Sequence, residues 1–99
     1  MSQNKNFTMV YYYIPEDIDD PEVPNVFGIN APQDDIKVSH IKSNFPLEGE
    51  YHFRFKQKLN NSIVWIDLAS PDEKLPIFNG RIFIKATRIS WNSSISIRS

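Results

Sequence analysis

The chain has 99 residues, 40% of them hydrophobic, which is the size of one small domain with enough apolar surface for a core. It has no cysteine, which excludes disulfides and thiolate metal sites, and its net charge of −1 argues against a general nucleic-acid surface. No apolar run approaches the roughly 20 residues that span a bilayer, and residues 1–6 are polar, so we expect a cytoplasmic protein with a disordered N-terminal segment.

The first two predicted strands cover residues 8–14 and 25–31. The first of them is β-branched and aromatic, which is typical of a strand. A loop with acidic and proline residues follows over residues 16–24. Pro24 just before the second strand and Gly28 within it disfavour a fully paired interior position, so the pattern predicts an edge strand.

One short helix is predicted over residues 37–45. Its apolar side chains recur at spacings of three and four, so they share one face that packs on the sheet. Asp34 and Asp35 precede the helix, where carboxylates cap backbone amides and favour the positive helix end. Pro46 ends the helix. So short a helix is unstable alone in water, and packing must therefore hold it in place.

The second half of the chain predicts three more strands. Residues 50–58 alternate aromatic and largely basic side chains, which predicts a half-buried strand with a basic outer face. The aromatic side is Tyr51, Phe53 and Phe55, and the outer side is His52, Arg54 and Lys56. A turn at residues 59–62 leads into a fourth strand over residues 63–68. After a loop and an Asn-Gly corner, residues 81–89 form the last strand.

This order of elements predicts an α+β fold, in which one short helix crosses a mixed five-stranded sheet as in the ubiquitin-like β-grasp. Its most distinctive segments are Val64-Trp65-Ile66-Asp67-Leu68 and Leu75-Pro76-Ile77-Phe78-Asn79-Gly80-Arg81. With residues 9–13, 24–29, 36–45 and 50–54, these segments resemble the DIX domain of Dishevelled and Axin and the DIX-like domain of plant SOSEKI proteins. We expect a DIX-like domain over residues 7–90, followed by a C-terminal tail or an extra edge strand over residues 91–99.

The resemblance implies a non-enzymatic interaction module that polymerises head-to-tail, with the second strand of one copy against the fourth strand of the next. The implied head positions are Ile63, Val64, Trp65 and Ile66, and the implied tail positions are Asn25, Val26, Phe27, Gly28 and Ile29. Asn25 stands where Dishevelled-type members have an aromatic residue, and Trp65 replaces a lysine. The family also implies a signalling or polarity scaffold of the Wnt type, without cofactor or metal, whose partners are itself and other DIX-domain proteins.

The charge pattern agrees with two opposed surfaces. Residues 1–35 hold seven acidic side chains and one basic, whereas residues 36–99 hold five acidic and ten basic. The acidic side chains Asp19, Asp20 and Glu22 precede the second strand, and the basic side chains Arg54, Lys56 and Lys58 lie on the hairpin beside the fourth. Such charges would steer copies toward each other in a salt-sensitive way. A solvated loop and scattered surface lysines explain the pattern equally well.

Other functions have less support in the sequence. His40 and His52 are the only histidines and form no recognisable metal-site pattern, and the neighbouring carboxylates lack a partner base. The aromatic face of residues 50–58 lies opposite the basic one, which argues against stacking on single-stranded nucleic acid. The serious rival is a ubiquitin-like adaptor that binds one heterologous protein without polymerising. Both faces of residues 63–68 are apolar, so they are either covered within the monomer or await a partner.

Overall fold

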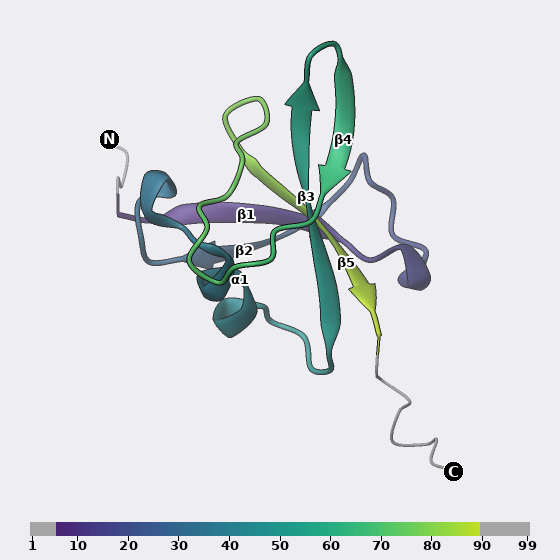
Figure 1. Ribbon diagram of the computed structural model, residues 1–99. Coiled ribbons are helices and arrows are strands. Elements are labelled where there is room, and N and C mark those ends of the chain that lie inside the picture. The colour runs from purple at the N-terminus through teal and green to yellow at the C-terminus, as the bar shows by residue number, and fades with distance from the viewer. Residues whose placement is uncertain (1–5, 90–99) are drawn as a thin grey trace.

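The computed structural model describes residues 6–89, which form one five-stranded sheet with a helix on one face (Figure 1). The expected disordered segment at residues 1–6 and the expected tail or strand at residues 91–99 lie almost wholly outside the described residues. Within the described part of the chain, no helix is both long and apolar enough to cross a membrane.

The sheet is mixed, with the strand order β2-β1-β5-β3-β4. The strands are β1 (Thr8–Tyr13), β2 (Asn25–Ile29), β3 (Tyr51–Leu59), β4 (Ser62–Ile66) and β5 (Ile82–Arg88). The helix is α1 (Val38–Asn44), and two 3-10 turns are η1 (Pro15–Asp17) and η2 (Gln33–Asp35). Only β1 and β5 are parallel, and every other neighbouring pair is antiparallel. The predicted α+β architecture and element order are confirmed, with the helix and strand ends within two residues of the prediction.

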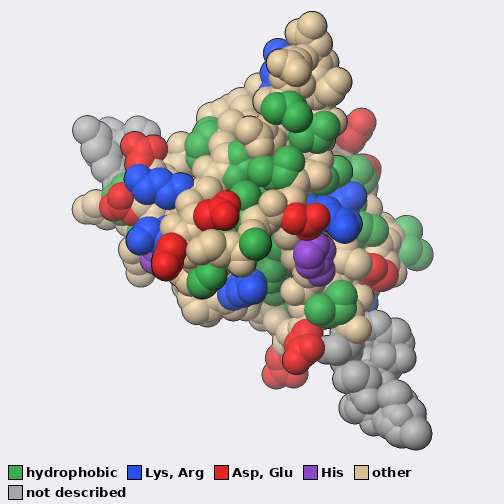
Figure 2. Space-filling model, viewed as in Figure 1, with side chains coloured by type: hydrophobic (Ala, Val, Ile, Leu, Met, Phe, Trp, Pro, Cys, Tyr) green, Lys and Arg blue, Asp and Glu red, His purple; other side chains and the backbone are tan. Residues whose placement is uncertain are grey.

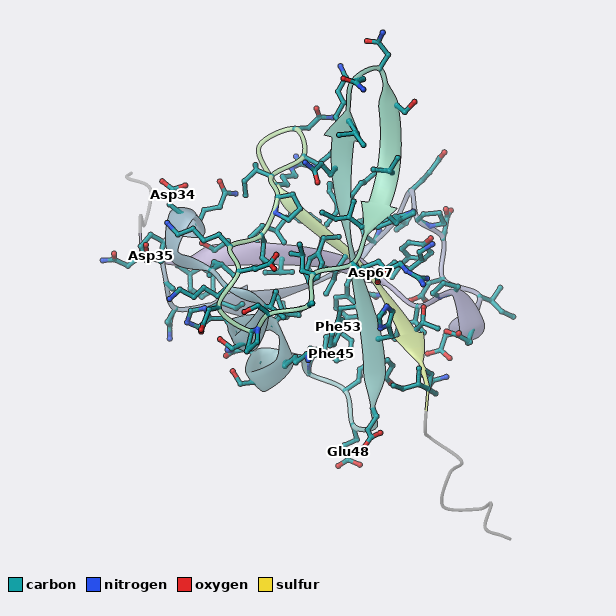
Figure 3. The ribbon with its side chains drawn as sticks, in the orientation of Figure 1. Asp34, Asp35, Phe45, Glu48, Phe53 and Asp67 are labelled. Carbon is teal, nitrogen blue, oxygen red and sulfur yellow. The ribbon has the colours of Figure 1, made fainter. Side chains whose placement is uncertain are left out.

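The core lies between the sheet and α1, on one face of the sheet. Its buried side chains alternate along the strands, as the two-residue period of a strand requires. Phe45, which directly follows the helix, is the hub of an aromatic cluster. Its ring centroid lies 5.0 Å from that of Tyr12, 4.9 Å from that of Tyr51 and 5.0 Å from that of Phe53. Figure 3 shows Phe45 and Phe53 together beneath the sheet, which confirms the inward face predicted for β3.

The start of α1 is capped by a distant loop, and the prediction that Asp34 and Asp35 cap it is wrong. Both carboxylates belong to η2 and point outward at the edge of the molecule in Figure 3. The Val38 amide donates instead to a backbone carbonyl of the loop that follows β4, at 3.0 Å, and the Ser39 amide does the same. The accepting carbonyls belong to residues 71 and 73. Backbone oxygens therefore satisfy the amides that we assigned to side-chain caps.

Asparagine and glycine occupy the tight turns, as their tolerance of positive φ predicts. Asn60 has a φ of 57° in the turn between β3 and β4. Asn79 and Gly80 have φ values of 51° and 77°, and they form the corner that leads into β5. Across this corner the Phe78 amide donates to the Arg81 carbonyl at 2.8 Å, and the Arg81 amide donates back at 3.0 Å. The Asn-Gly segment thus sets the start of the last core strand.

Candidate functional site

The strands β2 and β4 form the two edges of the sheet, and each is five residues long. In the described chain, neither has a neighbouring strand on its outer side. An edge strand presents a row of backbone amides and carbonyls that another strand can complete. The prediction that the second strand is an edge is confirmed, and the head and tail strands lie at opposite sides of the sheet (Figure 1).

The two edges are aligned with each other across the sheet. Asn25, Tyr12, Ile84, Phe55 and Ile66 are partners in turn and form one row that crosses all five strands. The chain directions of β2 and β4 are opposite, because three antiparallel pairings and one parallel pairing separate them, and both strands extend from this row toward the same end of the sheet. The first residue of β2 therefore lies at the same level as the last residue of β4.

The predicted tail residues divide between the two faces of β2. Phe27 and Ile29 point into the core and are buried, so they offer a partner their backbone but not their side chains. Val26 and Gly28 lie on the opposite, helix-free face. Asn25 is exposed, and its side-chain amide donates to the Asp19 carboxylate at 2.9 Å. Because successive strand residues point to opposite faces, the sequence alone could have separated the core-facing residues of β2 from those on the helix-free face.

A tail patch that sequence analysis missed lies on the helix-free face beside β2, formed by Phe7, Met9 and Val26. These side chains are 41%, 41% and 44% exposed. The Phe7 ring covers Gly28 so closely that a Cβ added there would lie 2.2 Å from its tip. Gly28 therefore provides the space for an aromatic ring on the edge strand. The alternation of Phe7, Met9 and Tyr11 was the available sequence signal.

The acidic loop, residues 16–24, is fixed to the sheet at two points. The Asp17 carboxylate accepts two hydrogen bonds from the Arg88 guanidinium, at 2.8 and 2.9 Å, and these lower the pKa of Asp17. The Asp19 carboxylate accepts the Asn25 side-chain amide and a backbone amide at the end of β1. Asp20 and Glu22 are exposed in the same loop. The predicted acidic tail residues are thus held next to the first residue of β2.

The predicted head residues alternate between the two faces of β4. Val64 and Ile66 lie on the core side and are half-buried. Ile63 and Trp65 lie on the helix-free face, where Ile63 is 59% exposed and Trp65 is half-buried. The Trp65 ring centroid lies 5.9 Å from that of Tyr13. The strand is therefore only partly covered within the monomer, and Figure 2 shows hydrophobic side chains over the β3–β4 hairpin at the top of the view.

Beside Trp65 lies a lysine–aromatic cluster, formed by Lys56, Lys85, Trp65, Phe78 and Phe83. The Lys56 ammonium lies 4.7 Å from the Phe78 ring centroid and 5.0 Å from that of Phe83. The Lys85 ammonium lies 5.0 Å from the Trp65 ring centroid. Within residues 6–89 neither lysine forms an ion pair with a carboxylate. The cluster therefore presents uncompensated positive charge on the head side of the sheet.

The other predicted basic residues of the head have different environments. Arg54 Nε lies 3.3 Å from the Asp67 carboxylate, which also lies 2.6 Å from His52 Nε2. These contacts, the histidine hydrogen bond above all, lower the pKa of Asp67. Lys58 is exposed on the hairpin. Arg54 therefore has a carboxylate neighbour, which it shares with His52, whereas Lys58 forms no ion pair within residues 6–89.

The two histidines lie in separate environments. His52 is an exposed strand residue beside Asp67, as expected for the outer face of β3. His40 is half-buried in α1, where its Nδ1 accepts the Lys37 backbone amide at 2.9 Å. In the described part of the chain, no three histidine, aspartate or glutamate side chains gather as metal ligands would.

Comparisons with known proteins identify one family. The family profile of the DIX domain matches residues 7–86. A point mutant of the SOSEKI polymerising domain has a similar structure, with a TM-score of 0.60 and 18% sequence identity over 84% of this chain and 97% of that one. At this identity the likeness concerns the fold. A comparison with curated proteins gave no significant match.

Proposed function

This chain belongs to the DIX domain family, and from that premise we propose that it associates head-to-tail with copies of itself. In this arrangement the edge strand β4 of one copy pairs with β2 of the next. The observation that carries the proposal is the opposite direction of β2 and β4 at the two edges of one sheet. A second copy in the same orientation would pair β2 antiparallel to β4 and keep its helix on the same face. Such a contact leaves a free edge at each end and therefore propagates.

The pairing is a β-augmentation, in which backbone hydrogen bonds supply affinity and side chains supply specificity. If the row through Asn25 and Ile66 continues into the next copy, Asn25 lies opposite Ile66 and Val26 lies opposite Trp65. Phe27 and Ile29 then contribute backbone groups while their side chains remain in the core. This register places the tail patch on the same face as Ile63 and Trp65. Apolar side chains of the two copies thus meet on the helix-free side.

Each joint is expected to be weak, because five-residue edges bury little area. Assembly then depends on local concentration, and a chain of copies presents many sites to other proteins at once. On this basis we assign the module a scaffold role in cytoplasmic signalling or cell polarity, with other DIX-domain proteins as further partners. The structurally similar SOSEKI domain is a polymerising domain, which supports the self-association on which this role depends.

A concentration series in sedimentation velocity, with one variant for each edge, tests the proposal. Ile63→Asp places a charge on the exposed face of β4, and Val26→Asp does so on β2; both positions spare the core. The wild-type protein should grow in mass with concentration, whereas each variant alone should remain monomeric. A mixture of the two should form a one-to-one complex that grows no further, because one variant retains its tail and the other its head. Leu47→Asp, an exposed change in the connection between α1 and β3, is the matched control.

The mixture separates this proposal from its rivals. A closed dimer that pairs β4 with β4 would persist in Val26→Asp and would not form between the two variants. A wild-type protein that stays monomeric at all concentrations would contradict self-association and favour the adaptor that binds one heterologous protein.

A further inference from the structure

Ile18 is an exposed side chain on a strained backbone. It is 92% exposed, more than any other large hydrophobic residue in the described chain. Its φ and ψ are 60° and 32°, the left-handed region, which is unfavourable for a β-branched residue. Asparagine or glycine would occupy this position more easily, as Asn60, Asn79 and Gly80 do elsewhere in the chain. Because the Ile18 side chain is almost fully exposed, it gains little packing energy within residues 6–89.

The residues on either side of Ile18 hold it in this conformation. Asp17 is fixed by the Arg88 guanidinium, and Asp19 is fixed by the Asn25 side chain. The Ile18 amide donates to the carbonyl at the start of η1 at 3.2 Å. The position is therefore pinned on both sides while its side chain projects into solvent. A projection ordered in advance loses little entropy when it binds.

Val23 is the second exposed apolar residue of the acidic loop, at 72%. It stands between the carboxylates of the loop and the first residue of β2, and its amide donates to the Asp20 carbonyl at 2.9 Å. Glu22 next to it donates its amide to the Asp20 carboxylate, also at 2.9 Å. The loop thus combines two exposed β-branched side chains with acidic groups in one internally bonded structure.

Antiparallel pairing of β2 with β4 brings this loop to the end of β4 on a neighbouring copy. The loop precedes Asn25, and Asn25 lies in the same row as Ile66, the last residue of β4. Trp65 and the lysine–aromatic cluster lie at that end of the strand. The head therefore offers an aromatic surface and ammonium groups that have no carboxylate partner within residues 6–89. The loop offers apolar side chains and carboxylates.

From this complementarity we infer that the acidic loop is a second contact of the joint, in which Ile18 and Val23 pack against the Trp65 surface of another copy. Asp20 and Glu22 of the loop then face Lys56 and Lys85 of that copy. The inference rests on the proposed head-to-tail function, and it adds a contact outside the strand pairing. It also gives a role to an isoleucine at a position where the backbone favours asparagine.

The test uses the one-to-one complex of Val26→Asp, which donates a head, with Ile63→Asp, which donates a tail. Ile18→Asn in the tail donor should raise the Kd of the complex by about fivefold or more, an effect that only a minority of interface residues reach. The same substitution in the head donor should leave the Kd unchanged, which makes it the matched control. Because asparagine suits the left-handed region, Ile18→Asn should also raise the melting temperature of the isolated tail donor.

The outcomes are distinguishable. An unchanged Kd with Ile18→Asn in the tail donor, or an equal loss with it in either donor, would overturn the inference and leave head-to-tail assembly standing. A lower melting temperature would show that Ile18 stabilises the monomer and would also overturn it. Failure of the two parent variants to form any complex would instead refute the proposed function itself.

Discussion

Gly28 and Phe7 provide a direct test of how the tail edge is built. The φ of Gly28 is not in the positive region, so the backbone accepts alanine, but the new Cβ would lie 2.2 Å from the Phe7 ring. The ring is the far end of a flexible side chain, and we expect it to leave β2. Full burial of a phenylalanine side chain contributes about 1.5–3 kcal/mol, and Phe7 is 41% exposed, so the lost contact is about 1–2 kcal/mol. Replacing glycine by alanine in a strand stabilises the folded state by about 0.5–1 kcal/mol, because the unfolded chain loses conformational freedom.

The net effect of Gly28→Ala is therefore a loss of about 0.5–1 kcal/mol of unfolding free energy, or a fall of several degrees in melting temperature. In a Phe7→Ala background there is no ring to displace, and Gly28→Ala should stabilise the domain by about 0.5–1 kcal/mol. Gly28→Ala should thus lower the unfolding free energy when Phe7 is present and raise it in the Phe7→Ala background. Thermal and urea unfolding of the four variants, each carrying Ile63→Asp to prevent assembly, measures it.

A double-mutant cycle isolates the contact between the two residues because neither residue belongs to the buried core. If Gly28→Ala destabilised both backgrounds equally, the ring would not be the cause and the reasoning would be refuted. Gly28→Ala in the tail donor, Ile63→Asp, should also weaken its complex with the head donor, Val26→Asp, because it displaces Phe7, one of the three side chains of the tail patch.

Two further predictions concern charge and backbone conformation. The Arg88 hydrogen bonds hold the pKa of Asp17 below its ordinary 3.8, so the stabilisation is present above that pH and is lost as pH falls through the lower folded value. Asp17→Asn should therefore lower the melting temperature at neutral pH, and the difference from wild type should shrink as the pH falls below 3.8 and Asp17 becomes protonated; a difference that does not change with pH would contradict this. Gly80→Ala should destabilise the domain by about 1 kcal/mol because its φ is 77°, whereas Gly80→Asn should be close to neutral in the same unfolding assay.

Local patterns in the sequence were sufficient for most of the fold. The alternation in residues 50–58 set the inward face of β3, because a strand places successive side chains on opposite faces. Pro24 and Gly28 marked the edge strand through their poor fit to an interior position. The Asn79-Gly80 corner followed from the tolerance of both residues for positive φ. Each of these patterns involves only a few neighbouring residues, so it can be recognised from the sequence without knowledge of the tertiary fold.

Contacts between distant segments could not be predicted in the same way. The carbonyls of residues 71 and 73 cap α1 because the tertiary fold brings that loop to the helix start, and carboxylates near the helix were the better local candidates. The lysine–aromatic cluster joins β3, β4, β5 and the loop before β5, so no single strand contains its pattern. By contrast, the burial of Phe27 and Ile29 was available from their alternation with Val26 and Gly28.

The distribution of charge favours open assembly over a closed dimer. In head-to-tail pairing the acidic loop meets the end of β4 near Lys85, and Asp34 and Asp35, which follow β2, lie toward Lys58 at its start. A two-fold pairing of β2 with β2 would bring each acidic loop toward those same two carboxylates on the partner. A two-fold pairing of β4 with β4 would bring Lys85 of one copy toward Lys58 of the other. Like charges oppose both closed dimers, whereas opposite charges support head-to-tail pairing. The charges beside β2 and β4 therefore favour pairing of β2 with β4 over pairing of either edge with its own copy.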